Sequence, residues 1–246
     1  MNEALSKMLK YLRLRGLLAD WEQTLALARK RRFSHTRLLN YVVEQEYNIK
    51  RENARQYRIK RAHIPEELLM ETFPFKKQPR LNRKAILSIY DAFDYMPNAQ
   101  NIIWVGPTGC GKTGLATSFL IDAINRGYSG GFISFAELTE ELRASGADYS
   151  ESKVLKRYLC CDCLLIDELG YVEIEPAQVG LFFTLMQRRH KKRPTLITSN
   201  LGFSEWRSFL KNDHLTAALI DRLTENSHVI NMKNCQSLRP KLAPTP

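Results

Sequence analysis

The first quarter of the chain has apolar residues at steps of three and four positions, the period of an amphipathic helix. The pattern breaks at the basic run from Arg29 to Arg32, and Ser34 is placed to cap a further helix. The apolar positions include Leu5, Met8, Leu9, Leu12 and Leu17 before the break and Leu38, Leu39, Val42 and Val43 after it. We predict a small all-α domain over residues 1–61.

Prolines end this pattern, and a different organisation follows. Pro65, Pro74 and Pro79 predict a linker over residues 62–81 that packs on a larger domain. Strands are then expected at 101–105, 131–135, 163–166, 195–198 and 228–232, and helices at 82–96, 113–126, 136–144, 152–159 and 176–192. This alternation indicates an α/β fold over residues 82–238, a parallel five-stranded sheet with helices on both faces. Residues 239–246, with three prolines, are expected to form a flexible tail.

Composition and cysteine usage narrow the class of protein. A hydrophobic share of 44% and a charged share of 26% are typical of a soluble globular chain. The sequence has no apolar run near the roughly 20 residues that cross a bilayer, and its start does not have the pattern of a secretory signal. Three of the five cysteines fall between Cys160 and Cys163, without the paired spacing of a zinc site, so small buried thiols explain them better than a metal. The odd count favours a reducing cytoplasm.

The net charge of +11 is concentrated near the N-terminus, where residues 1–61 hold 15 Lys and Arg against 6 Asp and Glu. A basic unit attached to a nearly neutral body favours a polyanion partner, and double-stranded DNA is the leading candidate. The alternative is a solvated basic face without a ligand. The candidate DNA-binding residues are Arg29, Lys30, Arg31, Arg32, Lys50, Arg51, Arg55 and Arg58.

A phosphate-binding loop connects the first expected strand to the next helix. It reads Gly106, Pro107, Thr108, Gly109, Cys110, Gly111, Lys112 and Thr113, which satisfies GxxxxGK[ST]. Glycines permit tight turns that aim successive N–H groups at a phosphate, and the following helix adds the positive end of its dipole. Lys112 is placed to reach the β- and γ-phosphates of ATP, and Thr113 to hold Mg²⁺. The strand–loop–helix context argues against a Gly-rich turn without nucleotide.

An apolar strand that ends in two acids follows about 50 residues later. Asp167 is expected to hold Mg²⁺ together with Thr113, and Glu168 to orient and deprotonate the attacking water. Asn200, after the fourth strand, is a candidate to position the same water, with a simple turn residue as the alternative. Arg222 is a candidate to neutralise γ-phosphate charge in a neighbouring subunit, with an ion pair to Asp221 or a solvated charge as alternatives.

These motifs together resemble a known family. The segments 165–171, 182–189, 198–200, 203–206 and 220–223 are similar to IstB, the AAA+ ATPase that assists transposition in IS21-family insertion sequences and is related to the helicase loader DnaC. The resemblance implies an AAA+ fold, assembly into an arc, ring or filament on DNA, and ATP-dependent help to a partner transposase. It makes Lys112 and Thr113 the phosphate and Mg²⁺ ligands, Asp167 and Glu168 the acidic pair, Asn200 the first sensor and Arg222 the arginine finger.

The chain departs from this family in two places that matter here. Ser237-Leu238-Arg239 stands where Ser-Tyr-Arg is common, and the chain ends soon after the fifth strand. A helical lid with a second sensor arginine is therefore expected to be absent.

Three functions remain open on these residues. They are a transposition regulator that assembles on target DNA, a replicative helicase loader of the same fold, and a non-catalytic DNA scaffold. Glu168 argues against the scaffold, because a pure nucleotide binder needs no water-orienting acid. The broadly basic residues 1–61 suit phosphate contacts better than docking on a helicase, so transposition is preferred.

Overall fold

The computed structural model describes residues 1–147, 151–171 and 174–239, and the chain divides into two compact units, Met1–Tyr57 and Arg58–Pro246. The division falls inside helix α4 (His35–Arg61), whose last residue is the position at which the sequence placed the end of the N-terminal domain.

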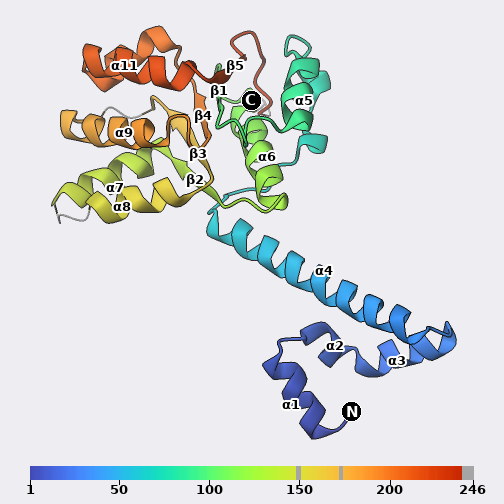
Figure 1. Ribbon diagram of the computed structural model, residues 1–246. Coiled ribbons are helices and arrows are strands. Elements are labelled where there is room, and N and C mark those ends of the chain that lie inside the picture. Colours follow the sequence, from blue (N-terminus) through green and yellow to red (C-terminus); the bar gives the residue numbers. More distant parts are fainter. Residues whose placement is uncertain (148–150, 172–173, 240–246) are drawn as a thin grey trace, which may run out of the picture. The chain divides into compact units, whose positions relative to one another are not determined.

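The N-terminal unit is entirely helical. It contains α1 (Glu3–Tyr11), α2 (Arg15–Ala19), α3 (Trp21–Lys30) and most of α4 (Figure 1). Gly16 permits a close approach of α2 to α4, because a Cβ there would lie 2.3 Å from Ile49 Cδ1. Beside it the buried Glu46 accepts a hydrogen bond from the Leu17 backbone N–H at 2.6 Å. The helix expected after Ser34 is α4, which has 27 residues.

The second unit is built on a parallel sheet of five strands. These are β1 (Asn101–Val105), β2 (Gly130–Ser134), β3 (Cys163–Leu169), β4 (Thr195–Ser199) and β5 (Ser227–Asn231), in the order β2-β3-β4-β1-β5. The fold class expected from the alternating pattern is confirmed. Because β1, β3 and β4 are neighbours and run in one direction, the loops after their carboxyl ends meet at one edge of the sheet.

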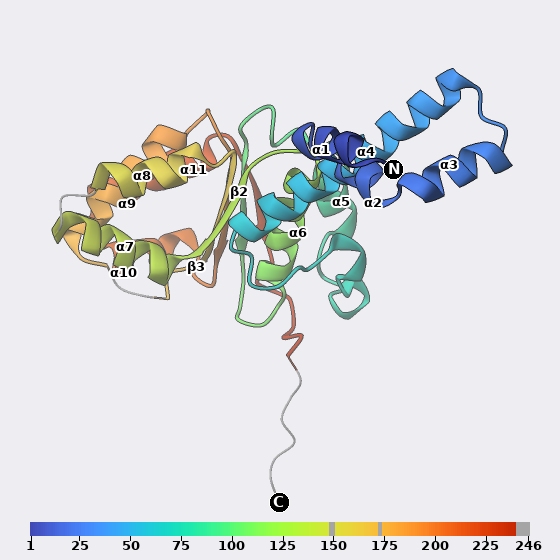
Figure 2. The ribbon, with the colours of Figure 1, turned by 90° about the horizontal axis from the view of Figure 1, so that it is seen from below.

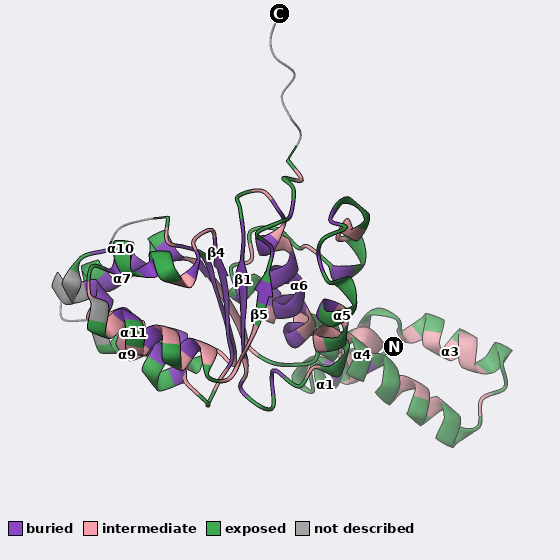
Figure 3. Ribbon diagram, turned by 90° about the horizontal axis from the view of Figure 1, so that it is seen from above, coloured by how far each residue is buried: buried purple, intermediate pink, exposed green. Residues whose placement is uncertain are grey.

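Helices cover both faces of this sheet (Figures 2 and 3). Ile102 and Trp104 of β1 pack on the side of α6 (Lys112–Asn125), together with residues of α5 (Arg83–Ala92). Ile103 and Val105 point to the opposite face, into a second core. That core includes residues of α7 (Phe135–Ala147), α8 (Glu151–Cys160), α9 (Pro176–Arg189), α10 (Trp206–Leu210) and α11 (Asp213–Thr224). All five residues of β1 are buried, as in a sheet covered on two sides.

Several boundaries differ from those expected. Helix α5 ends at Ala92 because Phe93 adopts a left-handed conformation, with φ at 59°. The linker before it contains two short 3-10 turns, Met70–Thr72 and Phe75–Lys77, and a third follows β4 at Phe203–Glu205. Of the helices in the described segments, none is long and apolar enough to span a bilayer.

Candidate nucleotide site

The loop after β1 has a backbone that requires glycine at two positions. Gly109 and Gly111 have φ values of 80° and 97°, in the left-handed region. A Cβ on Gly109 would also lie 2.6 Å from Ser237 Oγ, and one on Gly111 would lie 2.7 Å from Phe73 Cε2. Helix α6 begins directly after this turn, at Lys112. The loop is therefore a cradle of backbone N–H groups at a helix N-terminus, the arrangement that binds phosphate.

Lys112 is a buried cation, 8% exposed, inside this cradle. Its Nζ donates hydrogen bonds to the carbonyl oxygens of Gly106 and Pro107, at 2.8 and 2.9 Å. Burial lowers the pKa of its ammonium group. A desolvated amine held by two loop carbonyls gains by exchanging them for an anion, so its environment fits a phosphate.

Oxygen ligands of the kind that Mg²⁺ prefers lie beside Lys112. Thr113 Oγ1 donates to the two carboxylate oxygens of Asp167, at 3.0 and 3.2 Å. Asp167 is 7% exposed and also accepts a hydrogen bond from the hydroxyl of Thr198. A hydroxyl from the start of α6 and a carboxylate from the end of β3 thus form one group of donors that fits Mg²⁺.

The cavity at this edge of the sheet has a volume of about 190 Å³ and contains two more of the predicted site residues. Glu168 and Asn200 both line it. Asn200 Oδ1 is buried and has no hydrogen-bond partner among the described residues, so it is available to a ligand or a water. The lining consists of Thr108, Gly109, Gly111, Lys112, Thr113, Glu168, Tyr171, Asn200 and Arg239.

Two residues in that lining were missed from the sequence. The hydroxyl of Tyr171 shares a hydrogen bond of 2.7 Å with Thr108 Oγ1, across the mouth of the loop. Arg239 was assigned to the flexible tail, but Leu238 donates from its backbone N–H to Gly109 O at 2.8 Å and brings the next residue into the cavity. The only sequence signal was the family-like triplet ending at Arg239. The rest of that expected tail, 240–246, lies outside the described residues.

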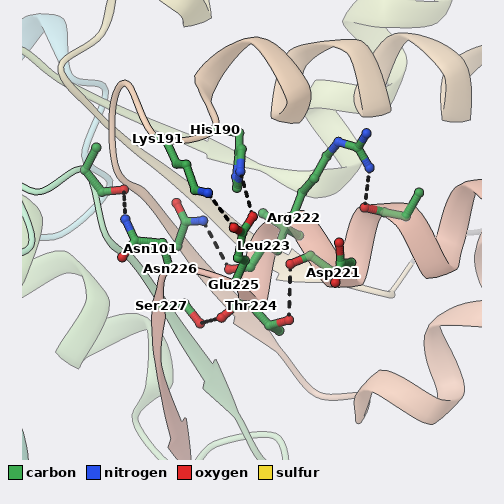
Figure 4. A network of polar contacts seen from close by, with 12 residues as sticks. Asn101, His190, Lys191, Asp221, Arg222, Leu223, Thr224, Glu225, Asn226 and Ser227 are labelled. Atoms are coloured by element: carbon green, nitrogen blue, oxygen red, sulfur yellow. Dashed lines mark hydrogen bonds and ion pairs between the residues drawn. The ribbon is translucent and has the colours of Figure 1, made fainter.

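Arg222 does not line the cavity of its own chain. Its guanidinium donates to Ala218 O at 2.9 Å and lies over the ring of Phe183, 4.9 Å from the centroid. Figure 4 shows the side chain directed along α11 and away from Asp221. The ion pairs drawn nearby instead join Glu225 to His190 and Lys191.

The neighbouring arginines of α9 differ sharply from each other. Arg188 is exposed, whereas Arg189 is 1% exposed and donates to Thr195 Oγ1 and to three carbonyl oxygens. Those acceptors lie at the amino ends of β3 and β4, the sheet edge opposite the cavity. Arg189 is therefore a buried structural residue.

The candidate DNA-binding residues are mostly on the surface. Arg29 and Lys30 form the last turn of α3, and Arg31 and Arg32 follow it; all four are exposed. On α4, Lys50 and Arg51 are exposed, Arg55 is paired with Glu52 at 3.0 Å, and Arg58 is half-buried. Arg51, Arg55 and Arg58 share one face of the helix, since they are spaced by four and three residues.

The cysteines of the 160–163 cluster lie in different environments. Burial raises the pKa of Cys163 to about 12, and Cys161 also has a raised pKa for the same reason. Cys160, in contrast to the expected buried thiols, is exposed. In the segments that the structure describes, no group of three or more His, Cys, Asp or Glu side chains is arranged to hold a metal ion.

Comparison with known proteins places these features in a family. The family model described as "IstB-like ATP binding protein" matches residues 7–243. The putative ATP-binding protein of insertion sequence IS5376 from Geobacillus stearothermophilus is 30% identical, over 95% of this chain and 92% of that protein. The one of IS21 from Pseudomonas aeruginosa is 28% identical, over 93% of this chain and 86% of that protein.

Solved structures show the same fold at lower identity. DnaI matches with a TM-score of 0.54 and 21% identity, covering 62% of this chain and 86% of that chain. AMPPCP-bound DnaA from Aquifex aeolicus matches with a TM-score of 0.58 and 16% identity, covering 71% and 52%. The second unit thus has the fold of P-loop AAA+ ATPases, and the family resemblance seen in the sequence is confirmed. The chain belongs to the family of IstB-like ATP-binding proteins of IS21-type insertion sequences.

Proposed function

We propose that this chain hydrolyses ATP, assembles on duplex DNA and uses the ATP cycle to capture a target site for a partner transposase. The observation that carries the proposal is the cavity of about 190 Å³, in which Lys112, Glu168 and Asn200 meet at the carboxyl edge of the sheet. Relatives of the chain are named as putative ATP-binding proteins of insertion sequences, which supports a role in transposition.

Binding of ATP follows from the loop. Its N–H groups and the positive end of α6 suit the phosphate chain, and Lys112 exchanges the carbonyls of Gly106 and Pro107 for β- and γ-phosphate oxygens. Thr113 and Asp167 are the residues that would hold Mg²⁺, which neutralises charge on those phosphates when it is bound.

In the proposed hydrolysis, Glu168 is the general base for the attacking water. The oxygen of a water forms a bond to the γ-phosphorus, the bond from that phosphorus to the β–γ bridging oxygen breaks, and ADP leaves. Glu168 accepts the proton that the water gives up. Asn200, whose Oδ1 has no hydrogen-bond partner among the described residues, orients the same water. Arg239 contributes a cation from within the chain.

Assembly follows from the position of Arg222. Since this arginine does not line its own cavity, a contact with a γ-phosphate needs the cavity of a second copy. Its packing on Phe183 holds the guanidinium in one orientation. We therefore assign Arg222 as the finger in trans, and the exposed Arg188 as the next candidate.

DNA binding is assigned to the N-terminal helices. The exposed basic run at Arg29–Arg32 and the basic face of α4 suit phosphate contacts without base readout. The likeness to the loaders DnaI and DnaC is one of fold, at 21% and 22% identity, so it does not favour helicase loading. A transposase reading frame directly upstream of the gene would support transposition, and a replication operon would support the loader.

The test compares Lys112→Ala and Glu168→Gln with Lys84→Ala, an exposed lysine of the same unit. Lys112→Ala should weaken ATP binding by about 10- to 100-fold, the value of a lost charge-assisted contact. Glu168→Gln should bind ATP like the parent and lose at least about 10²-fold in turnover. Titration calorimetry and phosphate release measure the two effects. Parent-like turnover in Glu168→Gln would show that the proton goes elsewhere.

A further inference from the structure

The strand pair β3–β4 is irregular at the two acids. Pairing is regular up to Ile166 opposite Ile197, and it resumes at Leu169 opposite Ser199. Asp167 and Glu168 therefore stand against one residue of β4, Thr198. Such a bulge inserts one extra residue and turns its side chain in a new direction, and bulges are common beside active sites.

The extra residue has an unfavourable backbone. Glu168 has φ at 58°, in the left-handed region that disfavours residues with a Cβ. This conformation turns the two consecutive acids in different directions. Asp167 stays buried beside Thr113, while Glu168 is exposed in the cavity. A conformation of this kind persists only where neighbouring groups enforce it.

Thr198 supplies that enforcement. Thr198 is fully buried, at 0% exposure. Its hydroxyl oxygen accepts the Glu168 backbone N–H at 2.9 Å, and its hydroxyl hydrogen is donated to Asp167 Oδ1 at 2.5 Å. One donor and one acceptor site of the hydroxyl are thus used on two consecutive residues of the bulge. Ser199 holds Leu169, the residue that follows the bulge, because the Ser199 hydroxyl donates to Leu169 O at 2.8 Å.

We propose that Thr198 is a positioning residue that locks the bulge of β3 and thereby aims the carboxylate of Glu168 at the attacking water. The inference rests on the proposed hydrolysis by Glu168. Thr198 does not itself line the cavity, and its hydroxyl bonds to Asp167 and Glu168 rather than to the phosphate loop. Its loss should therefore reduce the chemical step and spare nucleotide binding.

Thr198→Val is the direct test, because valine keeps the shape of threonine and removes only the hydroxyl. We expect turnover to fall by about 10²-fold, the cost of a displacement of about 1 Å in a reacting group. The ATP dissociation constant should stay within about threefold of the parent, since the loop is unchanged. Thr198→Ser keeps the hydroxyl and should restore turnover. Thr216→Val is the matched control, a buried threonine of α11 whose hydroxyl donates to Asn212 O at 2.6 Å, away from the cavity lining.

The double variant Thr198→Val/Glu168→Gln separates positioning from a general structural effect. A residue that acts through Glu168 should add nothing once Glu168 is gone, so the double variant should be no slower than Glu168→Gln alone. If Thr198→Val does not fold, Thr198→Ala provides the same comparison with a smaller side chain.

The outcomes separate this inference from the proposed function. Parent-like turnover in Thr198→Val with an inactive Glu168→Gln would overturn the inference alone. Equal loss in Thr198→Ser and Thr198→Val, or a full further loss in the double variant, would also overturn it. An active Glu168→Gln, or a parent without turnover, would overturn both.

Discussion

Replacing Arg189 by methionine tests whether this arginine is structural. Its guanidinium ties the end of α8 to the start of β4 by donating to Tyr158 O, Cys161 O, Pro194 O and Thr195 Oγ1. Burial lowers the pKa of Arg189 to about 10, so the group remains charged at neutral pH. Methionine fills much of the same volume and has no donor, so all four hydrogen bonds are lost, although Pro194 O still accepts the Leu164 backbone N–H at 3.4 Å.

The expected loss of stability is about 3 kcal/mol. Each of the three carbonyl oxygens loses a hydrogen bond to a charged donor at a cost of about 1 kcal/mol, and the lost hydroxyl contact adds to this. Relief from burying a charge offsets part of the total. For a unit of this size, about 3 kcal/mol corresponds to a fall in Tm of about 6–12 °C. Arg188→Met changes an exposed neighbour and should stay within about 0.5 kcal/mol of the parent.

Thermal and urea unfolding of the two variants, followed by circular dichroism, measures the difference. Below its melting temperature Arg189→Met should still bind and hydrolyse ATP, because the arginine lies at the sheet edge opposite the cavity. Equal melting temperatures for Arg188→Met and Arg189→Met would refute the structural role. Loss of assembly at an unchanged Tm would make Arg189 a finger.

Three further predictions concern DNA, assembly and the nucleotide. Changing Arg29–Arg32 to Gln should weaken binding to all duplex sequences alike and reduce the slope of log K against log salt by up to about 4, at ~0.9 per phosphate contact; an unchanged slope places the DNA contacts elsewhere. Arg222→Ala should bind ATP but lose DNA-stimulated turnover, and mixing it with Lys112→Ala should restore activity; normal assembly of Arg222→Ala would contradict the finger. Arg239→Met should weaken ATP binding by about tenfold, and unchanged affinity in calorimetry would mean that Arg239 only packs there.

The sequence predicted those parts of the protein that local patterns determine. The five strands and the phosphate loop follow from short apolar runs and from fixed spacing of Gly, Lys and Thr, so both were accessible before the structure. β3 was expected to end at Ile166 but continues to Leu169, because the bulge lets pairing resume after the acids. A pattern of apolar and polar residues does not predict that a glutamate within a strand adopts a left-handed backbone conformation.

Helices α10 and α11 were missed for a different reason. Helix α10 has five residues, among them Trp206, Phe209 and Leu210, which are too few to show a helical period. The helical form of α10 depends on tertiary burial, since all three side chains belong to the core on the α9 side of the sheet. Helix α11 did have local signals, since Asn212 caps it through Leu215 N at 3.0 Å and Leu215, Leu219 and Leu223 recur at four-residue steps.

The composition of the nucleotide cavity depends on contacts between distant segments. Gln78, in the linker and 2% exposed, donates from its side-chain amide to Cys110 O at 3.1 Å and Gln236 O at 2.6 Å, and accepts from Gln236 N at 3.0 Å. One buried amide thus joins the linker, the phosphate loop and the C-terminal segment. Since Leu238 is bonded in turn to Gly109, Arg239 has to follow the loop. A motif therefore identified the loop, but the linker and the C-terminal segment determine which cation lies beside it.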